Sequence, residues 1–267
     1  MTRGEALLAW YGTNHRDLPW RHTRDPYRIL VSEVMLQQTQ AERVVPFYER
    51  FIEQFPTVDD LATAPLAQVV AAWSGLGYNA RARRLREAAR IIATEGWPDP
   101  ASLDRLPGVG PYTAAALGSF AFGADSLVVD TNVRRVIGRW RGEVIDGARL
   151  RRTAVEESFG PAAAWNQAVM ELGALVCRPR PACDRCPVTR WCADPTVYEP
   201  PPKQSRFEGS DRQVRGALIR ILGSEWRNEA ALAAETGFPQ DRIRSALASL
   251  ETEGMVERGS RGARIAG

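Results

Sequence analysis

Apolar residues in the first 200 positions recur with the period of an α-helix. The pattern appears in five stretches, most of them ended by Gly or Pro: residues 6–11, 27–51, 66–77, 80–96 and 113–123. Side chains three or four positions apart share one face of a helix, so each stretch predicts an amphipathic helix. Only residues 126–130, SLVVD, indicate an extended segment. The chain is therefore predicted to be all-α over residues 4–200.

A different pattern follows this helical part. Residues 201–211 are polar and begin with Pro, which predicts a linker. Beyond it, three helical stretches and a strand-turn-strand pattern fill residues 212–267. Three helices followed by a hairpin resemble a winged helix. Winged helices bind DNA in some proteins and serve only for packing in others, so the pattern leaves both roles open.

The composition limits the classes of protein. Hydrophobic residues make up 44% and charged residues 25% of the 267, a balance typical of a soluble globular protein. The sequence has no run of 18 apolar residues and no apolar signal segment, which predicts a cytoplasmic protein without a membrane partner. Of 35 basic residues 34 are Arg, which suits bidentate contacts with phosphate, although a GC-rich genome produces the same bias.

All the cysteines lie close together, in the spacing C-x5-C-x2-C-x5-C: Cys177, Cys183, Cys186 and Cys192. Because cytosolic thiols are kept reduced, such a group indicates a metal site rather than disulfides. Four thiolates complete either a tetrahedral zinc site or a 4Fe–4S cluster. Zinc sites usually contain two C-x2-C pairs a dozen or more residues apart, so the single pair favours iron–sulfur and leaves zinc as the alternative.

Residues 106–116, LPGVGPYTAAA, form a Gly-containing turn before an Ala-rich helix. Gly108 and Gly110 lack a Cβ, which lets the backbone approach a partner closely. The N–H groups of the turn and of the helix start would face an anion, and phosphate is the natural one. A plain connection between two helices explains the stretch equally well.

Two acids stand out from their surroundings. Asp130 ends the run SLVVD and precedes a helical pattern, so the helix N-terminus should keep it ionised. Glu33 lies among apolar residues with no Lys to pair with it, so burial should raise its pKa. The simpler interpretation of Asp130 is an N-cap, and that of Glu33 is an exposed or Arg-paired acid. A neutral acid and a carboxylate together cleave glycosidic bonds, and a phosphate-binding turn suggests deoxyribose in DNA and a flipped base.

LPGVGPYTAAA followed by VVDTNVRR resembles the helix-hairpin-helix and catalytic aspartate of the endonuclease III superfamily of DNA glycosylases. LPW at 18–20, SEVMLQQTQ at 32–40, GLGY at 75–78 and the four cysteines narrow the resemblance to the MutY-type adenine DNA glycosylases. The resemblance spans about residues 4–200. It implies a two-lobed fold with a 4Fe–4S cluster on the cysteines. It also implies a nucleoid-associated monomer that removes adenine mispaired with 8-oxoguanine or guanine in double-stranded DNA.

The resemblance also implies roles for single residues. Glu33 would protonate N7 of the flipped adenine, and Asp130 would stabilise the sugar cation or form a transient covalent intermediate, with support from Tyr112 and Asn132. The adenine pocket would be lined by Arg16, Trp20 and Gln167. Contacts with DNA would come from two residues wedged into the duplex and from the hairpin: Gln38, Tyr78, Leu106, Gly108, Val109 and Gly110. The simpler interpretations are surface amides for Gln38 and Gln167 and core aromatics for Trp20 and Tyr78.

The type of reaction depends on Tyr112. Bifunctional relatives, which also cut the strand, have a nucleophilic Lys where this chain has Tyr112. The only lysine, Lys203, lies in the predicted linker, so a Schiff-base lyase step is not expected. The enzyme is predicted to be monofunctional and to leave an abasic site.

Two departures from the family bear on this interpretation. The first cysteine gap has five residues where the family usually has six. Where the usual relative has a Nudix-like domain that reads 8-oxoguanine, this chain has only the winged-helix-like part. Two alternatives therefore stay open, a mismatch glycosylase of the same fold acting on thymine or uracil opposite guanine, and a non-enzymatic iron–sulfur DNA-binding protein. The expected lobes are residues 1–25 with 124–200 around the cluster, and residues 26–123 with the hairpin.

Overall fold

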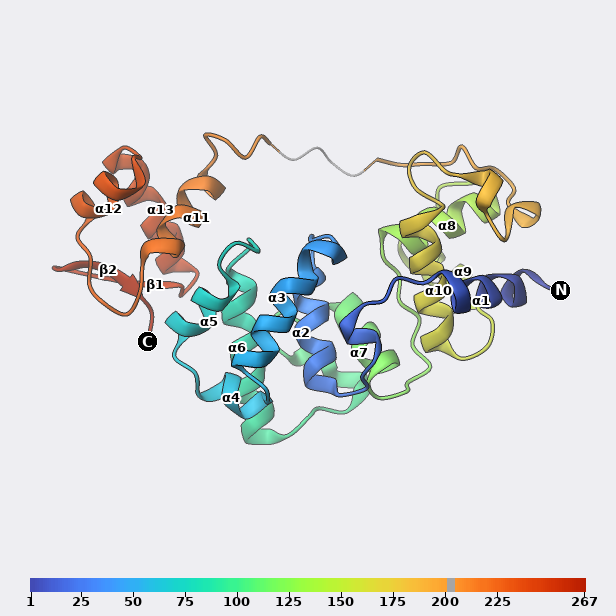
Figure 1. Ribbon diagram of the computed structural model, residues 1–267, viewed down its shortest axis with the longest axis horizontal. Helices are drawn as coiled ribbons and strands as arrows, with labels where there is room; N and C mark the ends of the chain where they lie inside the picture. Colours follow the sequence, from blue (N-terminus) through green and yellow to red (C-terminus); the bar gives the residue numbers. More distant parts are fainter. Residues whose placement is uncertain (201–204) are drawn as a thin grey trace. The chain divides into compact units, whose positions relative to one another are not determined.

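The computed structural model describes residues 1–200 and 205–267, which form two compact units (Figure 1). The first comprises Met1–Leu30, Asp99–Asp104 and Val109–Pro202, and the second comprises Val31–Pro98, Arg105–Gly108 and Lys203–Gly267. Helices dominate both units, which confirms the all-α prediction. Residues 201–204 of the predicted linker, Lys203 among them, lie outside the described residues. The lobe boundaries expected from the sequence stay a prediction.

The first unit is built around five longer helices. They are α1 (Arg3–Asn14), α7 (Pro111–Phe120), α8 (Thr131–Arg141), α9 (Gly147–Glu157) and α10 (Ala162–Leu175). Three 3-10 turns complete it: η1 (Pro19–Arg21), η3 (Cys183–Arg185) and η4 (Thr189–Trp191). Helix α1 begins in a capping box, because the Thr2 hydroxyl accepts from Glu5 N–H and the Glu5 carboxylate accepts from Thr2 N–H.

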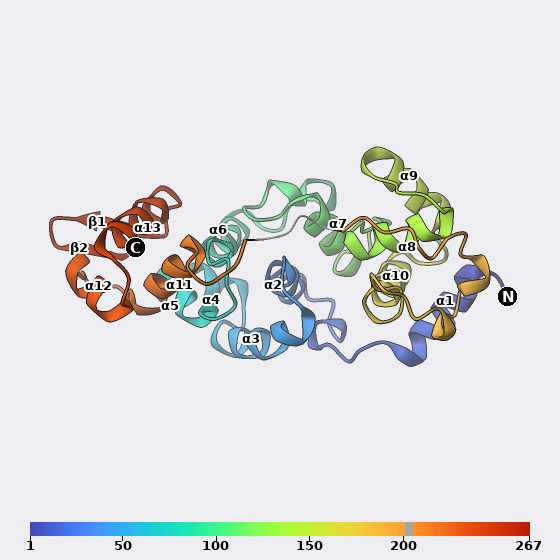
Figure 2. The same ribbon diagram turned by 90° about the horizontal axis from the view of Figure 1, so that it is seen from above.

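The core of the first unit lies between α8 and α10, which are side by side in both views (Figures 1 and 2). Leu7, Ile137, Trp165 and Leu172 are among its buried members. Gly173 makes the close approach possible, because a Cβ there would lie 2.6 Å from the Cβ of Asn132. The N-terminal end of α8, which carries the predicted catalytic aspartate, is thereby held against α10.

The second unit contains α3 (Ala41–Gln54), α4 (Val58–Thr63), α5 (Leu66–Trp73) and α6 (Ala80–Glu95). Helices α4 and α5 pack on α6, and α3 packs on α5. Helix α2 (Pro26–Leu36) and the 3-10 turn η2 (Pro100–Arg105) each pass from the first unit to the second. Among the described residues, no helix has both the length and the apolar character needed to cross a bilayer.

The structure differs from the sequence pattern in two places. The apolar period over residues 27–51 runs through two helices, because α2 ends at Leu36 and α3 begins at Ala41. No Gly or Pro lies between them, and the break comes from Gln38, whose φ is 56°. Residues 126–130 form no strand; the strands among the described residues are β1 (Val256–Gly259) and β2 (Gly262–Ile265).

The C-terminal part has the predicted winged-helix pattern of three helices and a hairpin. Its elements are α11 (Asp211–Ile221), α12 (Glu229–Thr236), α13 (Gln240–Thr252) and the antiparallel pair β1 and β2. Its core extends onto α5, since Leu66 and Val70 are buried in one cluster with Val214, Leu218 and Leu247. The winged helix therefore packs on the helical part of the second unit.

We expect Leu218→Ala to lower the free energy of unfolding by about 2–5 kcal/mol, because the fully buried side chain would leave a cavity in this shared cluster. Urea denaturation followed by circular dichroism measures the change. Leu8→Ala in α1, a half-buried position in the other unit, is the control and should cost less. A loss below about 1 kcal/mol for Leu218→Ala would contradict the packing described here.

Candidate active site and cysteine site

Asp130 is the N-cap of α8, and both of its carboxylate oxygens are hydrogen-bonded. Oδ1 accepts from the backbone N–H of Val133 at 2.6 Å, and Oδ2 accepts from the side-chain amide of Asn132 at 2.8 Å. The first bond is the N-cap contact that the sequence suggested. The second fixes the carboxylate plane, so the two residues that the resemblance pairs are in direct contact.

The electrostatic balance at Asp130 differs from the expectation. Burial raises the pKa of Asp130, and the hydrogen bonds from Val133 and Asn132, with the charge of Arg135, offset only part of that rise. The helix N-terminus therefore does not dominate, because the carboxylate is removed from water. A desolvated carboxylate interacts more strongly with a positive charge that develops close to it.

The segment before Asp130 is held by a buried amide. Asn166 of α10 accepts from Val128 N–H at 3.0 Å and donates to Ser126 O at 2.8 Å and to the Ser119 hydroxyl at 3.0 Å. These bonds replace the ladder that a neighbouring strand would provide. Residues 126–130 thus belong to no sheet, and the bonds from Asn166 help to position Asp130 at the start of α8.

Two arginines of α8 connect this helix to the cysteine segment. Arg135 donates to Asn132 Oδ1 at 2.8 Å, to Gly173 O at 2.8 Å and to Cys177 O at 2.6 Å. Arg139, which is buried, donates to Arg178 O at 2.6 Å, to Pro179 O at 3.0 Å and to Cys177 Sγ at 3.3 Å. The tightened first cysteine gap is therefore organised by backbone carbonyls that face α8.

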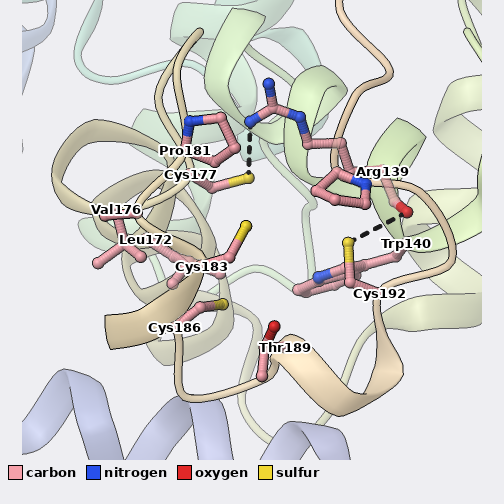
Figure 3. A pocket seen from close by; sticks show the side chains of 12 residues that line it. Arg139, Trp140, Leu172, Val176, Cys177, Pro181, Cys183, Cys186, Thr189 and Cys192 are labelled. Atoms are coloured by element: carbon pink, nitrogen blue, oxygen red, sulfur yellow. Dashed lines mark hydrogen bonds between the residues drawn. The ribbon is translucent and has the colours of Figure 1, made fainter.

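The four cysteines line one pocket, and none forms a disulfide (Figure 3). Their sulfur atoms face the same space, which Leu172 and Val176 border on one side and Trp140 on the other (Figure 3). Across residues 1–200 and 205–267, no three His, Cys, Asp or Glu side chains stand as the ligands of one metal ion.

The chemistry of the pocket suits a group that takes several thiolates. Burial, with a smaller contribution from the neighbouring thiols, raises the pKa of Cys192 to about 11. Burial also raises the pKa of Cys186. A raised pKa disfavours the thiolate form of Cys186 and Cys192 unless a cation stabilises it. Thiols that line one pocket, with Arg139 donating to Cys177 Sγ, are the type of donor set that the 4Fe–4S cluster implied by the resemblance would need.

Arg16 belongs to an ion-pair cluster that the sequence analysis missed. Glu171 of α10 is fully buried and accepts from Arg16 N–H and the Arg16 side chain at 2.7–3.0 Å and from Arg21 at 2.7 Å. Burial alone would raise the pKa of Glu171, but the bonds from Arg16 and Arg21 outweigh it and lower the pKa to about 2. Trp20, between these arginines, is buried.

Gln167 and Tyr112 lie on neighbouring helices of the same unit. The Tyr11 hydroxyl of α1 is hydrogen-bonded to Gln167 Oε1, which fixes the amide. The Tyr112 hydroxyl lies 3.6 Å from Met170 Sδ and is half-buried. Asp130, Asn132, Tyr112, Gln167, Arg16 and Trp20 are thus all carried by the first unit.

Glu33 lies in α2 and belongs to the second unit. Its side chain is 4% exposed, between the fully buried Val31 and Met35. The exposed-edge interpretation of Glu33 is therefore wrong. A buried acid at this position is what the proposed proton donor requires.

Gln38 and Tyr78 share an unusual backbone conformation. Among the described residues, they are the non-glycine residues with positive φ, at 56° and 50°. Each left-handed non-glycine residue costs about 1–3 kcal/mol, and such strain gathers at functional sites. Both side chains are exposed, Tyr78 to 42%, so the core-aromatic interpretation of Tyr78 is wrong.

The hairpin glycines have two different environments. Gly108 has φ 81°, and a Cβ there would lie 3.0 Å from Arg84 Cβ, so Gly108 is needed for folding onto α6. A Cβ on Gly110, the N-cap of α7, would meet nothing within 4 Å, which leaves room for a partner. Leu106 and Val109 are buried, so DNA would meet their backbone rather than their side chains.

Several of these structural residues carried no signal that sequence reasoning could use. Arg135 and Arg139 are not distinguished in the sequence from the other arginines, of which there are 34 in all. Glu171 had the same signal as Glu33, an acid inside an apolar helical run between Met170 and Leu172, and applying that criterion again would have found it.

Comparison with known proteins agrees with this geometry. Residues 31–160 match the model of the HhH-GPD superfamily of base excision DNA repair proteins, and residues 200–260 match that of the DprA winged helix domain. The adenine DNA glycosylase of Mycolicibacterium smegmatis is 40% identical over 94% of this chain and 91% of its own length. That of Mycobacterium tuberculosis is 44% identical over 81% of this chain and 77% of its own.

A solved structure of a thermostable thymine-DNA glycosylase has a TM-score of 0.66 and 32% identity, over 71% of this chain and 93% of its own. The helical fold and the family match thus define a helix-hairpin-helix base excision repair protein. The chain belongs to the adenine DNA glycosylase family.

Glu171→Gln should lower the free energy of unfolding at pH 7 by about 3 kcal/mol, because two buried arginine contacts lose their charge partner. The folded pKa of about 2 lies below the usual 4.5. The stabilisation is therefore present above pH 4.5 and is lost as the pH falls toward 2. The difference between wild type and variant, from denaturant unfolding, should shrink over that window. A difference that stays constant with pH would contradict the ion-pair account.

Proposed function

We propose that this chain is a monofunctional glycosylase that flips adenine out of a DNA mispair and hydrolyses its N-glycosidic bond. The observation that carries the proposal is the Asp130 carboxylate, held by Val133 N–H and Asn132 at the start of α8, with a pKa that desolvation raises. The similarity to adenine DNA glycosylases over most of the chain supports adenine as the base. The partner is double-stranded DNA, the working unit is a monomer, and the place of action is the nucleoid.

The chemistry divides between the two acids. Glu33, buried and protonated, donates its proton to N7 of adenine, and the electrons of the C1′–N9 bond move to the base as it leaves. Asp130 stabilises the positive charge that develops on the sugar, or bonds to C1′ transiently. Water then adds at C1′ and leaves an abasic site. Tyr112 stands where a lyase would need Lys, so no Schiff base forms.

The remaining site residues bind and orient. Arg16, Trp20 and Gln167 line the adenine pocket, and Tyr11 and Glu171 hold Gln167 and Arg16 in place. Gln38 and Tyr78 fill the duplex around the orphaned base. The N–H groups at Gly108–Gly110 take a phosphate, and the open space at Gly110 lets the DNA backbone approach.

The winged helix follows the helical part of the chain. The relative from Mycolicibacterium smegmatis aligns over 91% of its length, so a short C-terminal part occurs within the family. We propose that 8-oxoguanine and guanine are both accepted. In the winged helix, Arg242 is paired with Asp211 and Arg244 with Glu229, which favours packing over DNA binding.

Thymine or uracil opposite guanine is the second candidate substrate. The similarity to a thymine-DNA glycosylase structure favours it, at 32% identity. The higher identity to adenine DNA glycosylases, 44%, and the pocket amide of Gln167 favour adenine.

A 4Fe–4S cluster on Cys177, Cys183, Cys186 and Cys192 would serve structure rather than excision. When bound, the cluster supplies a cross-link that folds residues 177–192 into a single loop. Arg135 and Arg139 join that loop to α8 and so to Asp130. The exposed Arg178, Arg180, Arg185 and Arg190 then face phosphates.

Glu33→Gln and Asp130→Asn should each lower the single-turnover rate of adenine excision at least about 100-fold, because each removes a charge or proton that acts in the transition state. Affinity for the mispaired duplex should stay within about threefold. Matched controls are Glu49→Gln and Asp146→Asn, since Asp146 precedes α9 but its exposed side chain makes no cap bond. Wild-type turnover in either variant would remove that residue from the mechanism.

The purified protein should contain about four iron atoms per chain and absorb broadly near about 400 nm. Metal analysis and absorbance spectra measure both quantities. Cys186→Ser should lose most of the iron, whereas Thr189→Ser, in the same pocket, should keep it. Stoichiometric zinc without iron would contradict the cluster.

A further inference from the structure

We propose that Arg81 is a positioning residue that locks the two left-handed residues, Gln38 and Tyr78, into one arrangement. The inference rests on the proposed function, in which these two residues fill the duplex around the orphaned base. Arg81 lies in the first turn of α6, and its contacts reach both segments. All of these residues belong to the second unit.

One terminal nitrogen of Arg81 holds the end of α2. Nη1 donates to Val34 O at 2.8 Å, Met35 O at 2.9 Å and Gln37 O at 2.6 Å. The last carbonyls of a helix have no partner within the helix, so a cation from another helix satisfies them. The chain is thereby stopped immediately before Gln38, which is where the apolar period alone would have continued.

The other terminal nitrogen joins this end to the segment of Tyr78. Nη2 donates to Thr39 Oγ1 at 3.3 Å and to Gly77 O at 3.1 Å. Gly77 O also accepts from Trp73 Nε1 at 3.2 Å. The residues just after Gln38 and just before Tyr78 are therefore bonded to one planar group.

The rings around Arg81 complete the arrangement. The guanidinium carbon lies 5.5 Å from the ring centroid of Tyr78 and 5.4 Å from that of Trp73, within the range of a cation–π contact. The side chain of Arg81 is 7% exposed. Burial lowers its pKa to about 10, which leaves it charged at neutral pH.

Nη1 and Nη2 of Arg81 bind different segments, so a substitution that keeps only one set of hydrogen bonds tests the proposal. A lysine has one nitrogen with three donors, enough to keep the α2 carbonyls but not the bridge to Thr39 and Gly77. Arg81→Lys should therefore fold, but one side chain should no longer join the segment of Gln38 to the segment of Tyr78. Arg86→Lys is the matched control, because Arg86 also lies in α6 and donates to a carbonyl, Ala64 O, at 2.7 Å.

The first arm measures hydrogen–deuterium exchange in the protein without DNA. In Arg81→Lys, amides of residues 37–40 and of residues 74–81 should both exchange about tenfold faster than in wild type. Amides of α8 and α10 in the first unit should not change, which shows that the variant is folded. Faster exchange in only one of the two segments, or in neither, would overturn the proposal.

The second arm measures binding and single-turnover excision. Arg81→Lys should weaken binding to a duplex with adenine opposite 8-oxoguanine about tenfold. This loss is expected if about a tenth of the free molecules have both Gln38 and Tyr78 in the binding conformation. The affinity should fall by less than about twofold when the adenine lies opposite an abasic site, because that duplex has no orphaned base for Gln38 and Tyr78 to contact. The excision rate at saturating enzyme should stay near the wild-type rate.

An equal loss of affinity on both duplexes, or a lower saturated rate with unchanged affinity, would overturn the positioning role. Wild-type protein that removes no adenine would instead contradict the proposed function. In that case the exchange experiment would still test whether Arg81 couples the two segments.

Discussion

The attachment of α8 to the cysteine segment is the constraint on which the catalytic part depends. Asp130 is placed by the first turn of α8, through Val133 N–H and Asn132. Arg135 and Arg139, one and two turns further on, bind the carbonyls of residues 177–179. A shift of that segment would move the donors that hold Asn132. The cysteine segment is therefore joined to Asp130 through Arg135 and Asn132.

In the second unit, Arg81 has a structural role similar to that of Arg135 and Arg139 in the first. Glu33 is buried within α2, and Arg81 satisfies the carbonyls at the end of the same helix. The left-handed turn at Gln38 follows directly, so the buried Glu33 and the exposed Gln38 are separated by little more than one helical turn. Both units thus use a buried arginine to stop or anchor a helix close to a functional residue. Its planar fork, with donors to several carbonyls at once, suits this task better than lysine.

The helices and the winged helix could be predicted because their apolar periods match their buried faces, as in α5, where Leu66, Val69, Val70 and Trp73 are buried. The acids could be singled out because Glu33 interrupts an apolar run and Asp130 ends one. The break at Gln38 could not, since the carbonyls before it are bonded by Arg81, about forty positions later in the chain. The raised pKa of Asp130 depends on burial by distant elements, which a local N-cap pattern does not contain.

Removal of adenine by these residues can be measured by single-turnover excision on four duplexes, with adenine opposite 8-oxoguanine, adenine opposite guanine, thymine opposite guanine and uracil opposite guanine. Alkaline cleavage reveals the abasic product. The assignment of these residues to adenine removal predicts rapid release of adenine from the first two duplexes and no measurable release of thymine or uracil. Faster release of thymine or uracil than of adenine would contradict it and would require a new interpretation of Trp20 and Gln167.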